Sequence, residues 1–279
     1  PSAVPSGGPC GEPSGVPSGE PTDVPSGVPS GVSSAKPTDM PSGEPSSVPS
    51  LVPSNQPSGQ PTVDPCEWTG VGKIIRGHSF GDRAGETVAM SKDGKIVAVA
   101  SPLSDIGSCN AGAVRIYRLD ENLNMWVQLG DVIVGEAVED WSGESTLALS
   151  ADGMRVLIGA SRNEGSTADT AGHVRVFEYF APADYWYQLG ADIDGEAPID
   201  FSGISGACSN EGHIIAVGAH LNDGNGLDAG HVRVFKFDGS GWVQLGDDID
   251  GLSPTDYFGI FVALSADGLS LAVGAHSYN

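Results

Sequence analysis

The first 66 residues of this chain lack aromatic side chains, and the remainder has little proline. Residues 1–66 hold 16 of the 20 prolines and no aromatic residue, whereas residues 67–279 hold all five Trp, all eight Phe and all six Tyr. A hydrophobic core needs large apolar side chains to offset the conformational entropy that folding removes. We therefore expect one globular region, residues 67–279, and one non-globular segment, residues 1–66.

Long apolar runs and basic residues are also scarce. No run approaches the roughly 20 apolar residues that a membrane helix requires, so we expect no membrane-spanning segment. The 13 Lys and Arg residues face 36 Asp and Glu residues, which gives a net charge of −23. Such a surface repels phosphate backbones, so nucleic acid is excluded as an expected partner, while cations, basic proteins and neutral glycans remain.

The chain has neither an initiator Met nor an apolar stretch at its start. A secretory signal peptide would contain such a stretch. We expect either that a signal peptide has been removed or that the chain is a fragment.

Proline recurs at every fourth position from Pro1 to Pro65, with one exception at Ser33, and is followed by Ser or Thr in nearly every tetrad. Proline fixes φ and removes a backbone donor, which excludes helix and sheet. We expect a disordered, polyproline-like stalk. Ser and Thr beside Pro also suit O-glycosylation. We favour a modified stalk at the cell surface, in the cell wall or outside the cell over an unmodified tail.

Only four cysteines are present. Cys10 and Cys66 replace Ser at the two ends of the proline array, Cys109 lies in a polar segment, and Cys208 occupies an apolar strand position. Four cysteines permit three pairings, and the sequence does not choose among them. A Cys10–Cys66 disulfide and a bond to another chain are both open. Cys208 is interpreted as a small buried residue.

One sequence motif recurs in the globular region. Its copies begin at Trp68, Trp126, Trp186 and Trp242, which are 58, 60 and 56 residues apart. The three better copies read Trp-x-Gln-Leu-Gly. A fixed period of this kind is typical of repeat architectures, in which each unit buries its apolar face against its neighbours.

Each copy predicts four antiparallel strands. Alternating or fully apolar runs are separated by turn residues, as in Ser150-Ala-Asp-Gly153, for which we expect a type I′ hairpin turn with positive φ at both central residues. Four strands per copy, recurring around an axis, describe an all-β propeller. We place its blades at 67–125, 126–185, 186–241 and 242–279. The last stops before its fourth strand, so we expect about 3.7 blades of a larger ring that continues past residue 279.

The repeats resemble the FG-GAP class of propeller repeats found in the integrin α-subunit head and in many secreted algal and bacterial proteins. The resemblance rests on Trp-x-x-x-Gly, on Asp-x-x-Gly, on Ser-Ala-Asp-Gly and on the Phe258-Gly259 pair, and covers residues 68–279. The proline array joined to such repeats is similar to surface and secreted proteins of diatoms and related algae. Members of the FG-GAP class mostly bind, adhere or scaffold.

The resemblance also implies a Ca²⁺ loop of the form Asp-x-Asp-x-Asp-Gly-x-x-Asp, which this chain does not keep. The matching hairpins carry a single acidic residue, whereas calcium takes six to eight oxygen ligands. We therefore expect no cofactor. The alternative is Ca²⁺ in the segment 221–228, with Asp223, Asn225 and Asp228 as candidate ligands, although Asn and Asp also simply form turns.

Other polar residues recur in register. Asp82, Asp140, Asp200 and Asp256 each precede a glycine by three residues, and we expect their carboxylates to accept backbone N–H bonds within their own turns. The pairs Asp192/Asp194 and Asp248/Asp250 recur, which favours a structural role over general acid–base catalysis. His173 and His231 are interpreted as strand residues because neither has a Cys or His partner at metal-ligand spacing.

Our first hypothesis is a non-catalytic secreted or cell-surface protein for adhesion or matrix binding, with a protein or glycan ligand at the propeller loops. The alternative is an extracellular propeller enzyme that acts on polysaccharide, with its catalytic residues outside these repeats. An enzyme needs one blade that differs from the rest in its polar residues, and these repeats differ mainly in their loops.

Overall fold

The computed structural model describes residues 68–164 and 170–277. The expected stalk, residues 1–66, lies outside the described residues, as do Cys10 and Cys66. From Gly70 onward the chain forms one compact unit. The described residues contain strands and no helix, and hence no helix long and apolar enough to span a bilayer.

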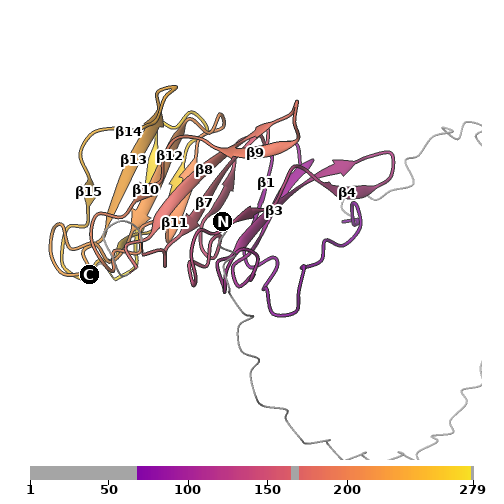
Figure 1. Cartoon of the computed structure of the whole chain (residues 1–279). Coiled ribbons are helices and arrows are strands. Elements are labelled where there is room, and N and C mark those ends of the chain that lie inside the picture. The colour runs from indigo at the N-terminus through magenta and orange to yellow at the C-terminus, as the bar shows by residue number, and fades with distance from the viewer. Residues whose placement is uncertain (1–67, 165–169, 278–279) are drawn as a thin grey trace, which may run out of the picture. The chain divides into compact units, whose positions relative to one another are not determined.

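The strands form four antiparallel sheets that follow one another along the chain (Figure 1). The first sheet has the order β1-β2-β3-β4, with β5 also paired to β3. Its strands are β1 (Val88–Met90), β2 (Ile96–Ser101), β3 (Ala113–Asp120), β4 (Met125–Gln128) and β5 (Ile133–Val134).

The second and third sheets repeat this order. The second consists of β6 (Leu147–Leu149), β7 (Arg155–Ala160), β8 (His173–Phe180), β9 (Tyr185–Gln188) and β10 (Ile193–Asp194). The third consists of β11 (Ser205–Cys208), β12 (Ile214–Ala219), β13 (His231–Phe237), β14 (Trp242–Gln244) and β15 (Ile249–Asp250). The last comprises β16 (Phe258–Leu264) and β17 (Leu271–Ala275).

The first strands of successive sheets contact one another: β1 meets β6, β6 meets β11, and β11 meets β16. Sheets of four antiparallel strands that touch through their first strands are propeller blades. The chain therefore has the expected all-β propeller class of fold.

The sheets do not begin at the tryptophans from which we counted the repeats. Trp126 lies in β4 and pairs with β3 of the sheet before it, and Trp186 likewise pairs with β8. The reason is that the Trp strand is reached by a short hairpin from the preceding strand, whereas a longer connection leads on to the next sheet. The limits 67–125, 126–185, 186–241 and 242–279 therefore cut across the sheets.

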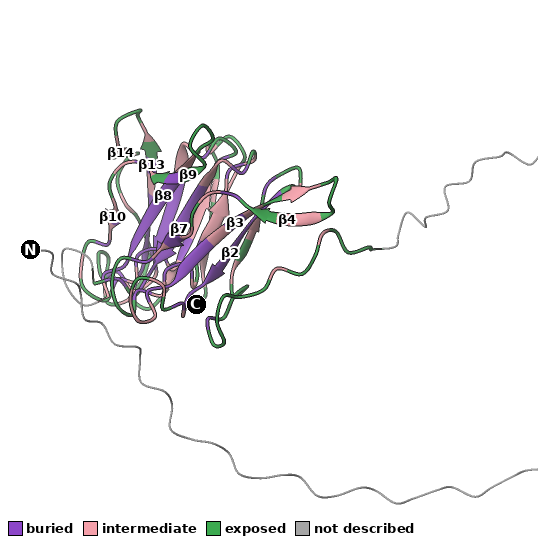
Figure 2. Ribbon diagram, turned by 45° about the vertical axis from the view of Figure 1, so that its right-hand side comes forward, coloured by how far each residue is buried: buried purple, intermediate pink, exposed green. Residues whose placement is uncertain are grey.

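The core lies between neighbouring sheets. In β7, Val156 and Ile158 face the first sheet, while Leu157 joins a second cluster with Ile215 and Val217 of the third sheet. Side chains alternate between the two faces of a strand, so an inner strand can be apolar throughout. Figure 2 shows this buried band through β7 and β8.

Glycine allows the sheets to approach closely. A Cβ added to Gly218 in β12 would lie 2.1 Å from the carbonyl oxygen of Gly259 in the last sheet, and one added to Gly159 in β7 would lie 2.4 Å from that of Gly203. Gly203 also donates its N–H to the Gly218 carbonyl at 3.0 Å. Small residues at the ends of β7 and β12 therefore permit direct backbone contact between blades.

The Ser-Ala-Asp-Gly hairpin turn differs from the expected type I′ turn. Between β6 and β7, Gly153 has φ 73°, while Asp152 is not among the residues with positive φ. The Asp152 carboxylate instead accepts bonds from the Ser150 hydroxyl at 2.6 Å and from the Met154 N–H at 2.9 Å. These side-chain bonds close the turn with a single left-handed residue.

Candidate functional site

Polar side chains gather where one sheet passes to the next. A cavity of about 360 Å³ lies at the passage from the first sheet to the second, and it is lined by Glu136, Ala137, Asn163, Glu164, His173, Asp192 and Asp194. Glu136 follows β5, His173 begins β8, and Asp192 lies between β9 and β10. Three separate segments thus bring a histidine and several carboxylates together.

The same three residue types, Glu, His and Asp, come together where the first sheet leads to the second and where the second leads to the third. The ligating atoms of Glu136, His173 and Asp192, which we call the first junction site, all lie within 4.8 Å of one another. Those of Glu196, His231 and Asp248, the second junction site, do so too. We expected His173 and His231 to be strand residues because neither has a Cys or His partner at metal-ligand spacing. That reasoning did not consider carboxylates as partners, and the structure places two carboxylates beside each histidine.

Both histidines are buried. His173 and His231 are each 1% exposed, and burial lowers the pKa of both imidazoles, with the neighbouring Arg175 and Arg233 acting in the same direction. The imidazoles are therefore neutral near pH 7. Within the described part of the chain, Nε2 of His173 and Nδ1 of His231 have no hydrogen-bond partner.

The arginines hold the glutamates of these sites. Arg175 lies 3.3 Å from Glu136, and Arg233 lies 3.5 Å from Glu196. Both guanidinium groups also donate to backbone carbonyls, of Val134 at 2.9 Å and of Asp194 at 2.6 Å. Arg175 and Arg233 therefore reach from their strands to the acidic residues of the preceding passage. Burial raises the pKa of Glu136, and Arg175 opposes that shift.

The four phased aspartates lie beside these passages and are buried. Asp200 accepts the Ala197 N–H at 3.0 Å, and Asp140 accepts the N–H groups of Glu136 and Ala137. Asp82 and Asp256 accept the N–H groups of Ser79 and Ser253, respectively. Each carboxylate therefore fixes the backbone at the entry to the next sheet.

The three residues that we considered for Ca²⁺ make turn contacts. Asp223 accepts the Asp228 N–H at 2.8 Å, and the Asn225 amide donates to the Gly251 carbonyl at 2.7 Å. Neither aspartate belongs to a His or acidic cluster among the described residues. The Asp223 carboxylate therefore closes the loop between β12 and β13, and Asn225 ties that loop to the chain after β15.

An aromatic side chain follows three of the phased aspartates. Trp141, Phe201 and Tyr257 have φ values of 52°, 54° and 53°, in the left-handed region that bulky residues avoid. Arg162 lies 4.0 Å from the Trp141 ring centroid, and His220 lies between Phe201 and Tyr257 at 6.0 and 6.2 Å. A second cavity of about 360 Å³, lined by Trp141, shares Glu164 with the cavity that contains the first junction site.

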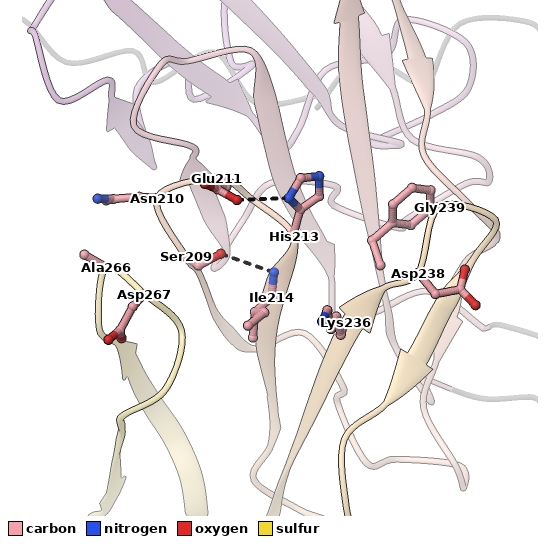
Figure 3. A pocket seen from close by; sticks show the side chains of 11 residues that line it. Ser209, Asn210, Glu211, His213, Ile214, Lys236, Asp238, Gly239, Ala266 and Asp267 are labelled. Carbon is pink, nitrogen blue, oxygen red and sulfur yellow. Dashed lines mark hydrogen bonds and ion pairs between the residues drawn. The ribbon is translucent and has the colours of Figure 1, made fainter.

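A larger cavity lies elsewhere. It measures about 730 Å³ and is lined by the turns after β11 and β16 and by Lys236 and Phe237 at the far end of β13 from His231 (Figure 3). His213 and Glu211, 3.4 Å apart there, are both exposed. Exposed pairs of this kind are common on surfaces, so we place the chemistry at the junction sites.

The cysteines within the described residues have different states. Cys109 is disulfide-bonded, and Cys208 in β11 is a free thiol. Burial raises the pKa of Cys208 to about 11. It packs against the second core cluster, which agrees with a small apolar role.

Comparison with known proteins identifies part of the proline-rich segment. Residues 1–32 match the PT disordered repeat, which agrees with the expected proline-rich stalk, and no curated protein matches the chain. Two similar solved structures are assigned as 6-phosphogluconolactonases, from Bacteroides fragilis (15% identity, TM-score 0.43, 67% of this chain and 41% of that one) and Bacteroides uniformis (14%, 0.42, 68% and 49%). A third is the periplasmic gluconolactonase of Pseudomonas aeruginosa (17%, 0.34, 67% and 63%).

These likenesses concern the fold alone, and the chain spans about two fifths to two thirds of the lengths of these proteins. The named structures are nevertheless enzymes, which contradicts our hypothesis of a non-catalytic adhesion or matrix protein. That hypothesis is wrong on this comparison and is not retained. The lactonase substrates are not transferred to this chain.

Proposed function

We propose that the chain is part of a propeller hydrolase that acts on a carbohydrate. The observation that carries the proposal is that Glu164 lines both the Trp141 cavity and the cavity that contains the first junction site. An aromatic ring beside convergent carboxylates suits a sugar, which offers an apolar ring face and many hydroxyls.

The residues have distinct roles in this proposal. Trp141 contacts a sugar ring, and its left-handed backbone is held by an N–H bond to the Asn110 carbonyl at 3.2 Å. Strained residues of this kind persist where the surroundings determine them, often at binding sites. Glu136 and Asp192 position the water and carry its proton, so that hydrolysis breaks one bond of the sugar and adds the elements of water across it.

The extracellular localisation and the FG-GAP family are also part of this proposal. A disulfide at Cys109 and the proline–serine array support an oxidising, extracellular setting, because exposed thiols are kept reduced in the cytosol. The Trp-x-x-x-Gly and Asp-x-x-Gly repeats support membership of the FG-GAP class within the propellers.

The test measures release of reducing sugar by the purified chain from neutral β-glucans, mannan and chitin. We expect one of them to be hydrolysed, with kcat/KM lowered about 10²–10⁴-fold by Glu136→Gln or Asp192→Asn. Trp141→Ala should raise KM more than it lowers kcat. Asp152→Asn, in the hairpin turn between β6 and β7, is the matched control and should match the unmodified chain. The proposal fails if no polysaccharide is cleaved, or if Glu136→Gln is as active as that control.

A further inference from the structure

For the first three sheets, Glu, His and Asp occur together or not at all. The first sheet has Ala113 where β8 and β13 begin with histidine, Val132 where the later sheets have Asp192 and Asp248, and His78 where the glutamates stand. A structural role for any one residue would not require the other two. The joint absence of all three in this copy points to one task that needs the whole set.

The groups around each set also repeat. The Gln188 amide donates to Oδ1 of Asp192, and the Gln244 amide donates to Oδ1 of Asp248, both at 2.6 Å. In the first sheet, which lacks the aspartate, Gln128 turns to the Gly130 carbonyl instead. Hydrogen bonds that fix a carboxylate by one oxygen and leave the other available are typical of the groups that orient metal ligands.

The second junction site shows the resulting geometry. Nδ1 of His231 lies 3.9 Å from Oε2 of Glu196 and 3.9 Å from Oδ2 of Asp248. Arg233 contacts the other glutamate oxygen, Oε1. Two ligands of one ion, each about 2.1 Å from it, lie at most about 4.2 Å apart, so both spacings allow a shared ion. A small closing movement of the exposed Glu196 side chain would complete the set.

The local charge favours a cation. Beside His173, the carboxylates of Asp140, Asp192 and Asp194 and that of Glu136 face the single guanidinium of Arg175. Beside His231, the carboxylates of Glu196, Asp200 and Asp248 face that of Arg233. An unpartnered nitrogen on a histidine that is 1% exposed is costly unless something binds it.

We propose that each junction site binds one divalent transition-metal ion of the Zn²⁺ type through an imidazole nitrogen and two carboxylates. Mixed nitrogen and oxygen ligands suit zinc, whereas calcium requires more oxygens than these sites offer. Three protein ligands leave a position for water, whose pKa a zinc ion lowers toward neutrality. In the metal-bound chain the ion would activate the water in place of the free carboxylates, which would then serve as its ligands, and its binding does not depend on that activity.

The test is isothermal titration of the metal-free full chain with Zn²⁺, in excess Ca²⁺ to occupy surface carboxylates. We expect two equivalents for the unmodified chain, one for His173→Ala or His231→Ala, and none for the double variant. His213→Ala removes an exposed histidine beside Glu211 and should keep two. Co²⁺ in place of Zn²⁺ should give visible absorption bands that halve in each single variant. If the histidine variants do not fold, Asp192→Asn and Asp248→Asn take their place with the same two readings.

The glutamines that position the aspartates allow a second measurement, the affinity of each site for Zn²⁺. Gln188→Ala should weaken the first site about 10–100-fold and leave the second unchanged, while Gln128→Ala should change neither. Fewer than two equivalents in the unmodified chain, or two equivalents in a folded double variant, would overturn the proposal. Because no substrate is present, loss of the proposed hydrolysis would leave this result standing, and failure to bind Zn²⁺ would leave carboxylate-driven hydrolysis to be judged by its own assay.

Discussion

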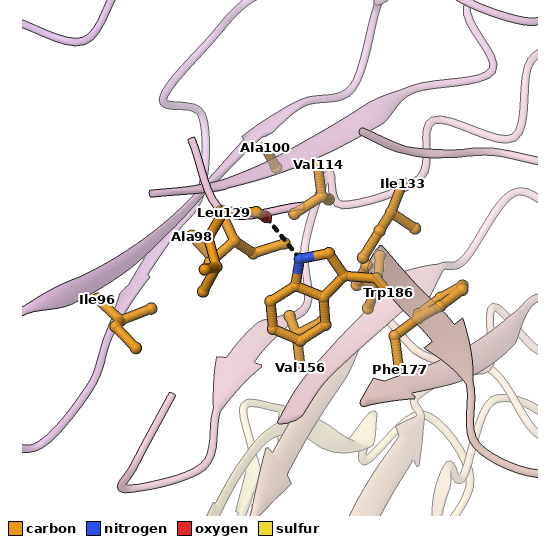
Figure 4. Packing of buried hydrophobic residues seen from close by; sticks show 11 residues of the cluster. Ile96, Ala98, Ala100, Val114, Leu129, Ile133, Val156, Phe177 and Trp186 are labelled. Carbon is orange, nitrogen blue, oxygen red and sulfur yellow. Dashed lines mark hydrogen bonds between the residues drawn. The ribbon is translucent and has the colours of Figure 1, made fainter. Parts of the chain in front are cut away.

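The indole of Trp186 donates from Nε1 to the Leu129 carbonyl oxygen at 2.8 Å and so joins the second sheet to the first (Figure 4). Gly130 is part of the same contact, because a Cβ there would lie 2.8 Å from the indole ring. Trp242 makes the equivalent bond to Leu189 at 2.6 Å, beside Gly190. The repeated Trp-x-x-x-Gly motif therefore connects neighbouring sheets: Trp186 and Trp242 each pack on the glycine of the sheet before their own.

Trp186→Ala should destabilise the chain by about 3–5 kcal/mol, because the indole is 8% exposed and would leave a cavity in the first core cluster. Trp68→Ala is the matched control, since Trp68 is 99% exposed and should cost little. Urea unfolding of both variants measures the difference. Equal losses would mean that the tryptophan joint does not stabilise the stack of sheets.

Gly218→Ala should destabilise the chain by about 1–3 kcal/mol or more, because the new Cβ would meet the Gly259 carbonyl oxygen at 2.1 Å. Gly241 has open space around it and no positive φ, so Gly241→Ala should be nearly neutral. Thermal unfolding compares the two. A neutral Gly218→Ala would argue against direct backbone contact between these blades.

Asp200→Ala should cost about 1–3 kcal/mol, because it leaves the Ala197 N–H and the Asn222 amide without their acceptor. The loss should be the same with Ca²⁺ or with a chelator of calcium, since the carboxylate serves its own turn. Denaturant unfolding under both conditions measures it. A wild-type chain stabilised by Ca²⁺, beside a variant that does not respond, would instead make these aspartates calcium ligands.

The free energy of unfolding should fall as the pH rises from about 9 to about 11. The Cys208 thiol has a pKa of about 11 in the folded chain against an ordinary 9.0, so the unfolded chain loses its proton first. The stabilisation is complete below pH 9 and is lost as the pH rises through the folded value. Cys208→Ser removes the titration, so the difference in stability between the two chains should shrink by on the order of 1–2 kcal/mol over this range. A constant difference would contradict the raised pKa of the half-buried Cys208 thiol.

Apolar side chains on the outer faces should promote self-association of the full chain. Phe261 is 72% exposed and Leu252 is 75% exposed. Large exposed apolar groups of this kind mark interaction or aggregation surfaces. Sedimentation should show association that weakens in Phe261→Ser, while Lys92→Ser, on an exposed turn, should associate as before. Monomers at all concentrations for the unmodified chain would contradict this.

Much of the fold could be predicted because the period is written into the sequence. The Trp-x-x-x-Gly copies predicted a repeating sheet, although Trp68 lies in no strand and the last described sheet contains no tryptophan, and period-2 alternation predicted the strands. The residue at which each sheet begins could not be predicted, because a repeated sequence can be divided at any point of its period. Only the pairing of Trp126 with β3 shows that the tryptophan strand belongs to the preceding sheet. The junction sites were missed because their members come from three segments, with Glu136 and His173 37 positions apart. Comparing Ala113 and Val132 with their counterparts in the later copies was the signal that could have found them.

Anomalous diffraction from crystals of the full chain grown with Zn²⁺ tests the central claim most directly, because it locates the ions without assuming their ligands. We predict one peak between Glu136, His173 and Asp192 and one between Glu196, His231 and Asp248, with none at Asp223, Asn225 and Asp228. Zinc bound at that loop, or ions found only at the exposed His213–Glu211 pair, would contradict the assignment of the chemistry to the junctions between sheets.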